Sequence, residues 1–146
     1  MIKHTTITIE SKSEPEFIDI SDQVSDFVKE SGVNHGLINV QSMHTSAALL
    51  VNENEPLLLK DLATHFDKLS PKTIEYNHDN MTVRTVNVCE GECANGYAHC
   101  RAAHLMSNVT MNIIDGKLQL GQWQRILFAE LDRPRTRTIQ LMIVGE

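Results

Sequence analysis

The stretch VTMNIIDGKLQL at residues 109–120 is the strongest local signal of fold in this sequence. Its first half, residues 109–114, is rich in β-branched and apolar residues. Asp115 and Gly116 form a dipeptide that is typical of a tight hairpin turn, and residues 117–120 return along the first half. The stretch therefore predicts two antiparallel strands joined by a turn.

Two more strands follow the hairpin. Residues 122–131 and 137–144 have strand patterns, and a turn at residues 132–134 joins them. Such short connections join antiparallel neighbours, because parallel strands need a longer crossover. The C-terminal third of the chain therefore predicts an antiparallel sheet.

Upstream of the hairpin, strand and helix patterns alternate. Residues 4–10 and 36–42 predict strands, whereas the apolar run at residues 45–51 fits a strand without deciding for one. Three segments have helical spacing or end signals, with Ser21, Pro56 and Asn95 at their starts. They are residues 21–32, which end at Gly32, residues 56–69, which end before Pro71, and residues 95–105.

Strands outnumber helices, so the sequence predicts an α+β fold with mostly antiparallel sheets and two or three short helices. The 146 residues contain no repeat, low-complexity tract or linker, and we expect a single domain over residues 1–146. No apolar run approaches the roughly 20 residues of a membrane-spanning helix, and the N-terminus lacks the apolar core of a signal peptide. We expect a cytoplasmic protein that contacts no membrane.

The net charge bears on the class of partner, and the cysteines bear on metal or redox chemistry. The chain has 13 Lys and Arg against 19 Asp and Glu, and its net charge of −6 disfavours nucleic acid as a partner. The three cysteines, Cys89, Cys93 and Cys100, are odd in number and clustered, which favours reduced thiols. Their spacing matches no standard zinc or thioredoxin motif, so a metal or redox role is the less favoured alternative.

Histidines are the first pattern that suggests chemistry, since the chain has 7 of them. His44 follows a predicted strand, His78 precedes Asp79 in a polar stretch, and His99 lies on the predicted third helix. Three imidazoles from separate elements near a carboxylate can hold a divalent metal with one position open. No two of them form a short local motif, so histidines that only pack or lie on the surface remain the alternative.

Arginines form the second pattern, near the C-terminus. They alternate along one segment and recur in the preceding strand: Arg125, Arg133, Arg135 and Arg137. Alternate residues of an extended chain share one face, so these guanidinium groups would form a row that suits phosphate or carboxylate ligands. The alternatives are charges that protect a sheet edge, or intersubunit ion pairs with Glu130 and Asp132.

The single tryptophan, Trp123, is flanked by Gln122 and Gln124. We expect Trp123 in the core, with Gln124 as a pocket-lining residue in the alternative. Asn52 and Asn95 can supply polar wall groups or serve turns.

Four segments, taken in order, resemble the YjbQ family of small proteins. They are HTSAALLVNENE at residues 44–55, YNHD at 76–79, NGYAHCR at 95–101, and DGKLQLGQWQRI at 115–126 with its continuation ELDRPRTR at 130–137. The resemblance covers nearly the whole chain. Gln122 stands where the family usually has threonine, and His104 and Met106 also depart from its pattern, as expected for a divergent branch.

The resemblance implies a compact α+β subunit in a homotrimer, with a pocket around the matched histidines near a subunit interface. Together with the histidine pattern, it favours a site at His44, His78 and His99 that binds zinc, manganese or magnesium. The family is often labelled a secondary thiamine-phosphate synthase. That label implies transfer between small phosphorylated molecules with release of pyrophosphate.

Our first hypothesis is therefore an enzyme that acts on a small phosphorylated molecule. Its expected catalytic residues are His44, Glu53, Asp79, His99, Gln124 and Glu130. Its expected substrate-binding residues are Asn52, Asn95, Arg125, Arg133, Arg135 and Arg137. The alternatives are a trimer that binds a metal or small anion without turnover, and a purely structural role for the ionic groups.

Overall fold

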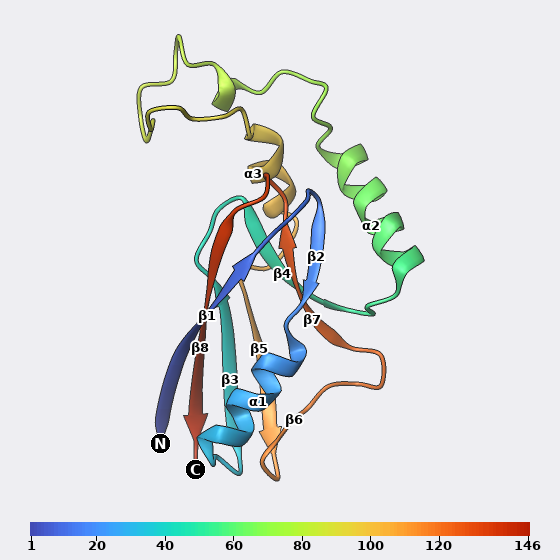
Figure 1. Cartoon of the computed structure of the whole chain (residues 1–146), viewed down its shortest axis with the longest axis vertical. Helices are drawn as coiled ribbons and strands as arrows, with labels where there is room; N and C mark the ends of the chain where they lie inside the picture. Colours follow the sequence, from blue (N-terminus) through green and yellow to red (C-terminus); the bar gives the residue numbers. More distant parts are fainter.

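Two antiparallel sheets pack face to face in the computed structural model, which describes all 146 residues (Figure 1). The larger sheet has the strand order β1 (Ile2–Glu10), β8 (Thr136–Gly145), β3 (Gly36–Ser42), β5 (Asn108–Ile114) and β6 (Lys117–Leu118). The smaller sheet has the order β2 (Glu16–Asp19), β7 (Arg125–Glu130) and β4 (Ala47–Asn52). The predicted α+β class is confirmed.

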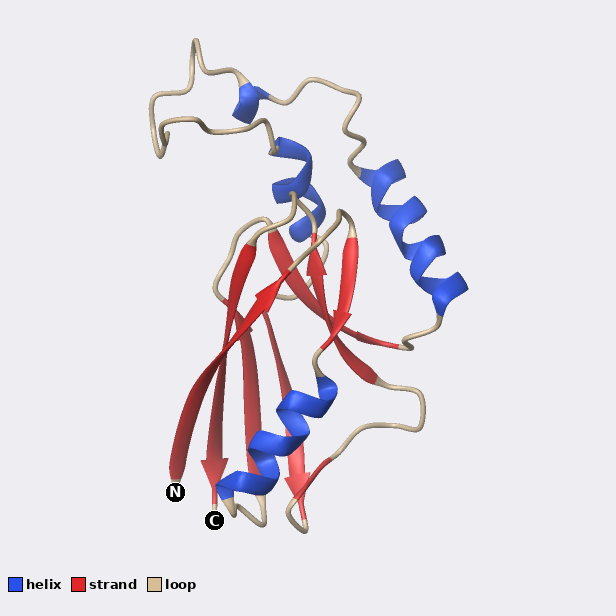
Figure 2. Ribbon diagram, viewed as in Figure 1, coloured by secondary structure: helices blue, strands red, loops and turns tan.

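Three α-helices and one short 3-10 helix accompany the sheets, as Figure 2 shows in blue. They are α1 (Ser21–Ser31), α2 (Pro56–Leu69), η1 (Asn77–Asp79) and α3 (Gly96–Ala102). Helix α1 buries Val24 and Val28, one turn apart, in the main core and ends at Gly32, whose φ of 70° suits a glycine. Helices α2 and α3 lie at the opposite end of the molecule, where the chain also forms the projecting segment 80–94 (Figure 1).

The hairpin at residues 109–120 forms as the sequence predicts. Asp115 and Gly116 have positive φ values of 51° and 68°, as the favoured two-residue hairpin turn requires. Ile113 pairs with Leu118, and the return strand ends there rather than at residue 120.

Strand β7 separates two hydrophobic cores. Ile126 and Phe128 belong to a core of 16 buried residues between the sheets, whereas Leu127 and Ala129 belong to a core of 7 under α2 and α3. Because neighbouring side chains of a strand point to opposite faces, β7 is buried on both sides. Its C-terminal end is thereby fixed firmly, and the polar residues that follow it have a rigid base.

Several local expectations need correction. Strand β2 was not predicted, and the strand expected at residues 122–131 covers only Arg125–Glu130. Trp123 lies in the loop before it and is 65% exposed, so it is not a core residue. The third helix ends at Ala102, before the expected end at residue 105. Ser21 is the first helical residue rather than the cap, and its Oγ accepts the backbone N–H of Ile126 at 2.7 Å.

None of the helices combines the length and the apolar character that crossing a membrane requires.

Candidate functional site

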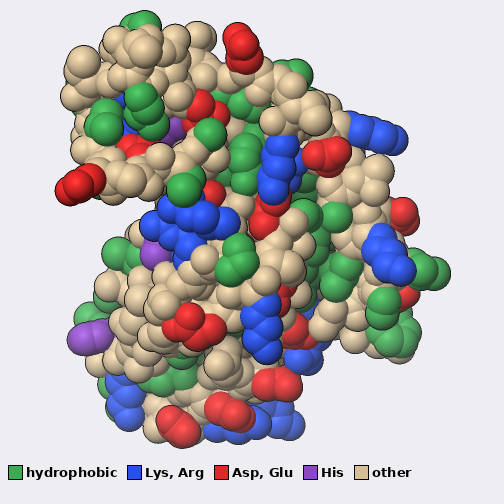
Figure 3. Space-filling view, turned by 45° about the horizontal axis from the view of Figure 1, so that its top comes forward, with side chains coloured by type: hydrophobic (Ala, Val, Ile, Leu, Met, Phe, Trp, Pro, Cys, Tyr) green, Lys and Arg blue, Asp and Glu red, His purple; other side chains and the backbone are tan.

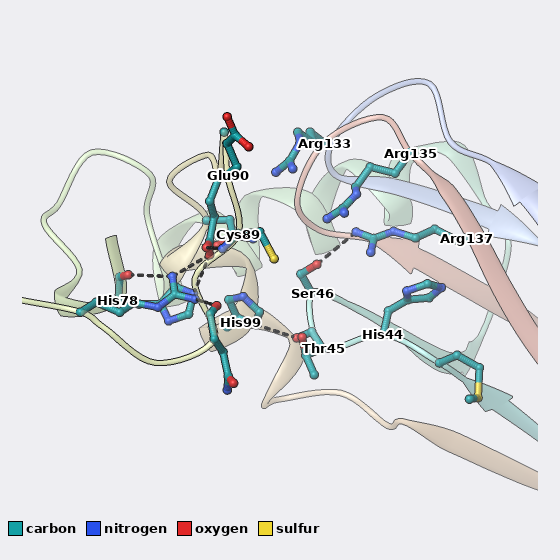
Figure 4. Close-up of a pocket in the computed structure, with 16 residues that line it drawn as sticks. His44, Thr45, Ser46, His78, Cys89, Glu90, His99, Arg133, Arg135 and Arg137 are labelled. Atoms are coloured by element: carbon teal, nitrogen blue, oxygen red, sulfur yellow. Dashed lines mark hydrogen bonds and ion pairs between the residues drawn. The ribbon is translucent and has the colours of Figure 1, made fainter. Parts of the chain in front are cut away.

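A cavity of about 570 Å³ lies where the loop before β4, the turn before β8 and the segment 78–99 meet (Figure 4). Figure 3 shows a hollow on this face, between the projecting segment and a group of Lys and Arg side chains. Its lining is almost entirely polar and includes three histidines and four arginines: His44, His78, His99, Arg84, Arg133, Arg135 and Arg137.

The buried foundation of this cavity is an ion pair. Arg137 reaches the Glu130 carboxylate through two bonds, Nε to Oε2 at 2.7 Å and Nη2 to Oε1 at 2.6 Å. The same Nη2 donates to Ser46 Oγ at 3.1 Å, and Ser11 Oγ donates to Glu130 Oε2 at 2.9 Å. These bonds use Nε and Nη2 of Arg137, which leaves its Nη1 for a ligand in the cavity.

Asp132 holds the other two arginines of the turn. Its carboxylate is buried and accepts Arg133 Nη1 at 3.0 Å and Arg135 Nη1 at 3.1 Å. Asn95 Nδ2 also donates to it, at 3.2 Å. Arg133 and Arg135 keep 38% and 41% of their side chains exposed, so most of their N–H groups stay free for an anion.

His44 lies beside these arginines, and its hydrogen bond indicates which ring nitrogen carries the proton. Its Nε2 accepts the backbone N–H of Thr138 at 2.8 Å, so the proton of the neutral ring is on Nδ1. Burial, and after it the charge of Arg137, lowers the pKa of His44 from its ordinary value of 6.5, although Glu130 opposes the shift. At pH 7 this imidazole is neutral.

His99 and His78 form a second imidazole group on the opposite wall. The ring centroids are 4.6 Å apart, and His99 Nδ1 lies 3.1 Å from the carbonyl oxygen of Thr45. Burial, and then the neighbouring His78, lowers the pKa of His99. The Nε2 atom of His78 is buried without a hydrogen-bond partner in the protein.

Asp79 places His99 indirectly, by capping α3. Its Oδ1 accepts the backbone N–H groups of Asn95 and Gly96, each at 2.9 Å, whereas Asn95 makes no side-chain cap bond. Gly96 is required at this contact, because a Cβ there would lie 2.5 Å from Tyr76 Cβ. The expected cap at Asn95 is thus replaced by a carboxylate from η1.

The projecting segment closes the cavity on the side of His78. Arg84 Nη1 donates to Glu92 Oε1 at 2.6 Å and to the His78 carbonyl oxygen at 3.1 Å. Its Nη2 donates to the Asn87 carbonyl oxygen at 2.6 Å. These bonds gather the segment around one guanidinium. Cys89 also lines the cavity as a free thiol.

A family model described as UPF0047 protein YjbQ-like matches residues 5–146. The chain belongs to the YjbQ family. A UPF0047 protein from Archaeoglobus fulgidus is 38% identical over 133 residues, which cover 91% of this chain and 94% of the relative. One from Methanothermobacter thermautotrophicus is 36% identical over 131 residues, or 90% of this chain and 84% of the relative.

Solved YjbQ-family structures agree with this fold. A YbjQ-like protein of unknown function from Sulfolobus solfataricus aligns with a TM-score of 0.89 at 29% identity, over 100% of this chain and 99% of that chain. A family member from Clostridium acetobutylicum aligns with a TM-score of 0.83 at 34% identity, over 96% and 99%. Both are described as uncharacterised or of unknown function, so they add no activity.

The YjbQ-like motifs of this chain divide between two places. The cavity brings together His44, His78, Asn95, His99, Arg133, Arg135 and Arg137, with Glu130 buried behind Arg137. A second group lies at the other end of the β4–β7 pair: Asn52, Glu53, Gln124 and Arg125. Of these, Glu53 and Arg125 line a pocket of about 430 Å³ together with Trp123. In this group Arg125 is paired with Asp19 and Asp22.

Asp79 joins neither group as a free acid or base, because its Oδ1 is used in capping α3. Of the expected acid–base residues, therefore, only His44 and His99 line the cavity. Glu53 and Gln124 do not line it.

The three histidines do not form a metal site in this geometry. His44 Nε2 is occupied by the Thr138 N–H, whereas His78 and His99 pair with each other on the opposite wall. The chain holds no other group of three His, Cys, Asp or Glu side chains placed for a metal ion. Zinc, manganese or magnesium at these histidines stays a prediction.

Sequence reasoning missed the residues that organise the cavity. Asp132 was considered only as an ion-pair partner, although its place beside the arginines at the turn was a usable signal. Ser46 follows His44 by two residues and belongs to the same motif. Arg84 and Glu92 lie in a polar stretch without periodicity, so no local pattern singled them out.

Proposed function

We propose that the cavity binds a small phosphorylated molecule, with its phosphate group held by the arginines that follow β7. The observation that supports this best is the arrangement of Arg133, Arg135 and Arg137 on one cavity wall. Two of them are held by the same buried carboxylate, Asp132, through Nη1 alone. Guanidinium groups with free N–H donors at a fixed spacing are suited to phosphate oxygens.

The size and charge of the site favour a small ligand over a polymer. A cavity of about 570 Å³ is in the range of small-molecule sites. The net charge of −6 repels a nucleic-acid backbone, whereas a single phosphate contacts only the local arginines.

Binding is tested by isothermal titration calorimetry with inorganic phosphate and simple phosphate monoesters. Arg135→Gln should weaken phosphate binding about tenfold, the range of one charge-assisted hydrogen bond. Arg125→Gln is the matched control, because Arg125 is of similar exposure but lies at the other end of β7. Equal affinities of the two variants would contradict the proposed site.

We further propose acid–base chemistry on the bound molecule, with neutral His99 as the proton acceptor and His44 as a hydrogen-bond donor through Nδ1. An imidazole with a pKa near or below 7 can accept a proton at neutral pH, as a general base does. The assay follows product formation from phosphate monoesters, and from the pyrimidine pyrophosphate and thiazole phosphate pair that the family label names. His99→Ala should abolish turnover and leave the circular dichroism spectrum unchanged.

The alternative function is a binding protein without turnover, and the same polar cavity suits it too. Thermal stabilisation by phosphate esters with no product formed would favour this alternative.

The homotrimer is a further prediction, which light scattering of the purified chain tests by its mass. Elemental analysis, compared with His78→Ala, tests the predicted divalent metal.

A further inference from the structure

The two walls of the cavity differ in the hydrogen-bonding role of their imidazoles. His99 Nδ1 lies 3.1 Å from the Thr45 carbonyl oxygen, and a carbonyl oxygen only accepts. Nδ1 therefore carries the proton of the neutral ring, and Nε2 is left as a bare acceptor. The lowered pKa of His99, which burial and the neighbouring His78 cause, is consistent with the neutral ring.

The arginine wall has the opposite character. His44 accepts the Thr138 N–H at Nε2, so its second ring nitrogen is a donor. The neighbouring arginines, Arg133, Arg135 and Arg137, offer donors only. The cavity thus presents donors at one end and an acceptor at the other.

The surroundings of His99 supply no protein donor for its Nε2. Its nearest ring is His78, whose buried Nε2 also has no partner in the protein and lies 3.9 Å from Glu92 Oε1. The Glu92 carboxylate is another acceptor, and the hydrogen bonds that Arg84 donates go to Glu92 and to the backbone carbonyl oxygens of His78, Val86 and Asn87. The Nε2 atom of His99 thus has no hydrogen-bond partner in the protein, and a ligand that donates to it would supply one.

We propose that the ligand carries a hydrogen-bond donor beside its phosphate, a hydroxyl or an amino group, and that His99 Nε2 accepts from this donor. The inference rests on the proposed phosphate site and adds the second recognition element of the ligand. His99 is anchored to Thr45, the residue after His44, and it lines the same cavity of about 570 Å³ as the arginines. Phosphorylated alcohols or amines are the class that meets both requirements.

Three phosphate esters of similar size test this recognition. 2-Hydroxyethyl phosphate donates and accepts, 2-methoxyethyl phosphate only accepts, and n-propyl phosphate does neither. In calorimetry at pH 8.0, 2-hydroxyethyl phosphate should bind about tenfold more tightly than the other two, because they leave the acceptor unpaired. Equal affinities for the three esters would overturn the inference.

His99→Asn is the decisive variant. The asparagine amide nitrogen stands close to the position of Nδ1 and can keep the bond to Thr45, but the acceptor at Nε2 is lost. The preference for 2-hydroxyethyl phosphate should disappear, while inorganic phosphate binds as before. A preference that persists in His99→Asn would overturn the assignment to His99.

Failure of this inference is distinguishable from failure of the proposed function. If wild-type protein binds no inorganic phosphate, the arginine site itself is wrong. If phosphate binds but the three esters bind equally, only the donor inference is wrong. Long-range ¹⁵N–¹H correlation spectra give a readout without ligand, in which His99 at pH 8.0 should show Nδ1 protonated and Nε2 bare; the reverse tautomer would overturn the inference.

Discussion

Glu130 and Arg137 face each other at the junction of β7 and β8, where two bonds of 2.7 and 2.6 Å join the guanidinium to the carboxylate. Glu130 is fully buried and Arg137 only 2% exposed, so water screens neither charge. Ser11 and the backbone N–H of Asp132 supply further bonds to the carboxylate. Glu130 thus fixes an arginine that lines the cavity, and its expected catalytic role stays a prediction.

Removing the charge of Glu130 should destabilise the protein strongly. Glu130→Gln leaves the buried Arg137 without its counter-charge, and we expect the free energy of unfolding to fall by about 3 kcal/mol. Urea denaturation measures the loss. Glu53→Gln is the control, because Glu53 is exposed and its substitution should change stability by less than about 0.5 kcal/mol. Similar values for both variants would contradict the buried ion pair.

Asp132→Asn tests the carboxylate that Arg133 and Arg135 share. Hydrogen bonds to a buried charge contribute roughly 1.5–3 kcal/mol, and we expect a loss of about 2 kcal/mol in urea denaturation. Asp115→Asn, at an exposed hairpin turn, is the control and should leave the midpoint nearly unchanged. A loss for Asp115→Asn as large as for Asp132→Asn would argue against the shared anchor.

Gly96→Ala should displace the start of α3. The added Cβ would lie 2.5 Å from Tyr76 Cβ and 3.2 Å from Asp79 Oδ2, so the capping contact has to open. We expect a destabilisation of about 1–3 kcal/mol, the range of overpacked sites. Thermal unfolding followed by circular dichroism measures the shift. An unchanged midpoint would show that η1 and α3 are not locked together.

Acid should weaken the fold before its carboxylates titrate. The pKa values of His44 and His99 are lowered from 6.5, chiefly by burial, so the unfolded chain binds protons more readily than the folded one. Stability is therefore fully present above pH 6.5 and falls as the pH drops below it. The other lowered pKa values belong to Glu55, Glu92 and Asp19, which titrate below 4.5.

Urea midpoints between pH 8 and pH 5 measure this dependence. The double variant His44→Gln, His99→Gln should show a flatter profile over the same range, because neither glutamine titrates. A double variant with the wild-type slope would assign the effect to other groups.

Local patterns predicted the parts of the fold that local chemistry decides. The Asp115–Gly116 turn requires positive φ at both positions, and few residue pairs satisfy this. The sequence of residues 109–120 therefore predicts the hairpin. Gly32 ended α1 for the same reason. Strand β2 has only four residues, and its pairing with β7 is a long-range contact that no local pattern encodes.

The candidate site was predictable in residue type more than in arrangement. The register of β4 against β7 pairs Ala47 with Glu130 at one end and Asn52 with Arg125 at the other. Five residues of extended chain separate these ends by roughly 17 Å. Motif residues that are near in sequence are therefore far apart in space, whereas His78 and His99, from separate elements, meet.

The position of β7 between both cores has a consequence for how the molecule opens. Its alternate side chains serve the sheet sandwich and the helical layer in turn, so neither layer can melt without exposing one face of the strand. We expect the amide protons of residues 126–129 to exchange with solvent only through global unfolding. The side of the cavity next to Glu130 would then keep its structure for as long as the chain is folded. Local opening would be confined to the projecting segment around Arg84.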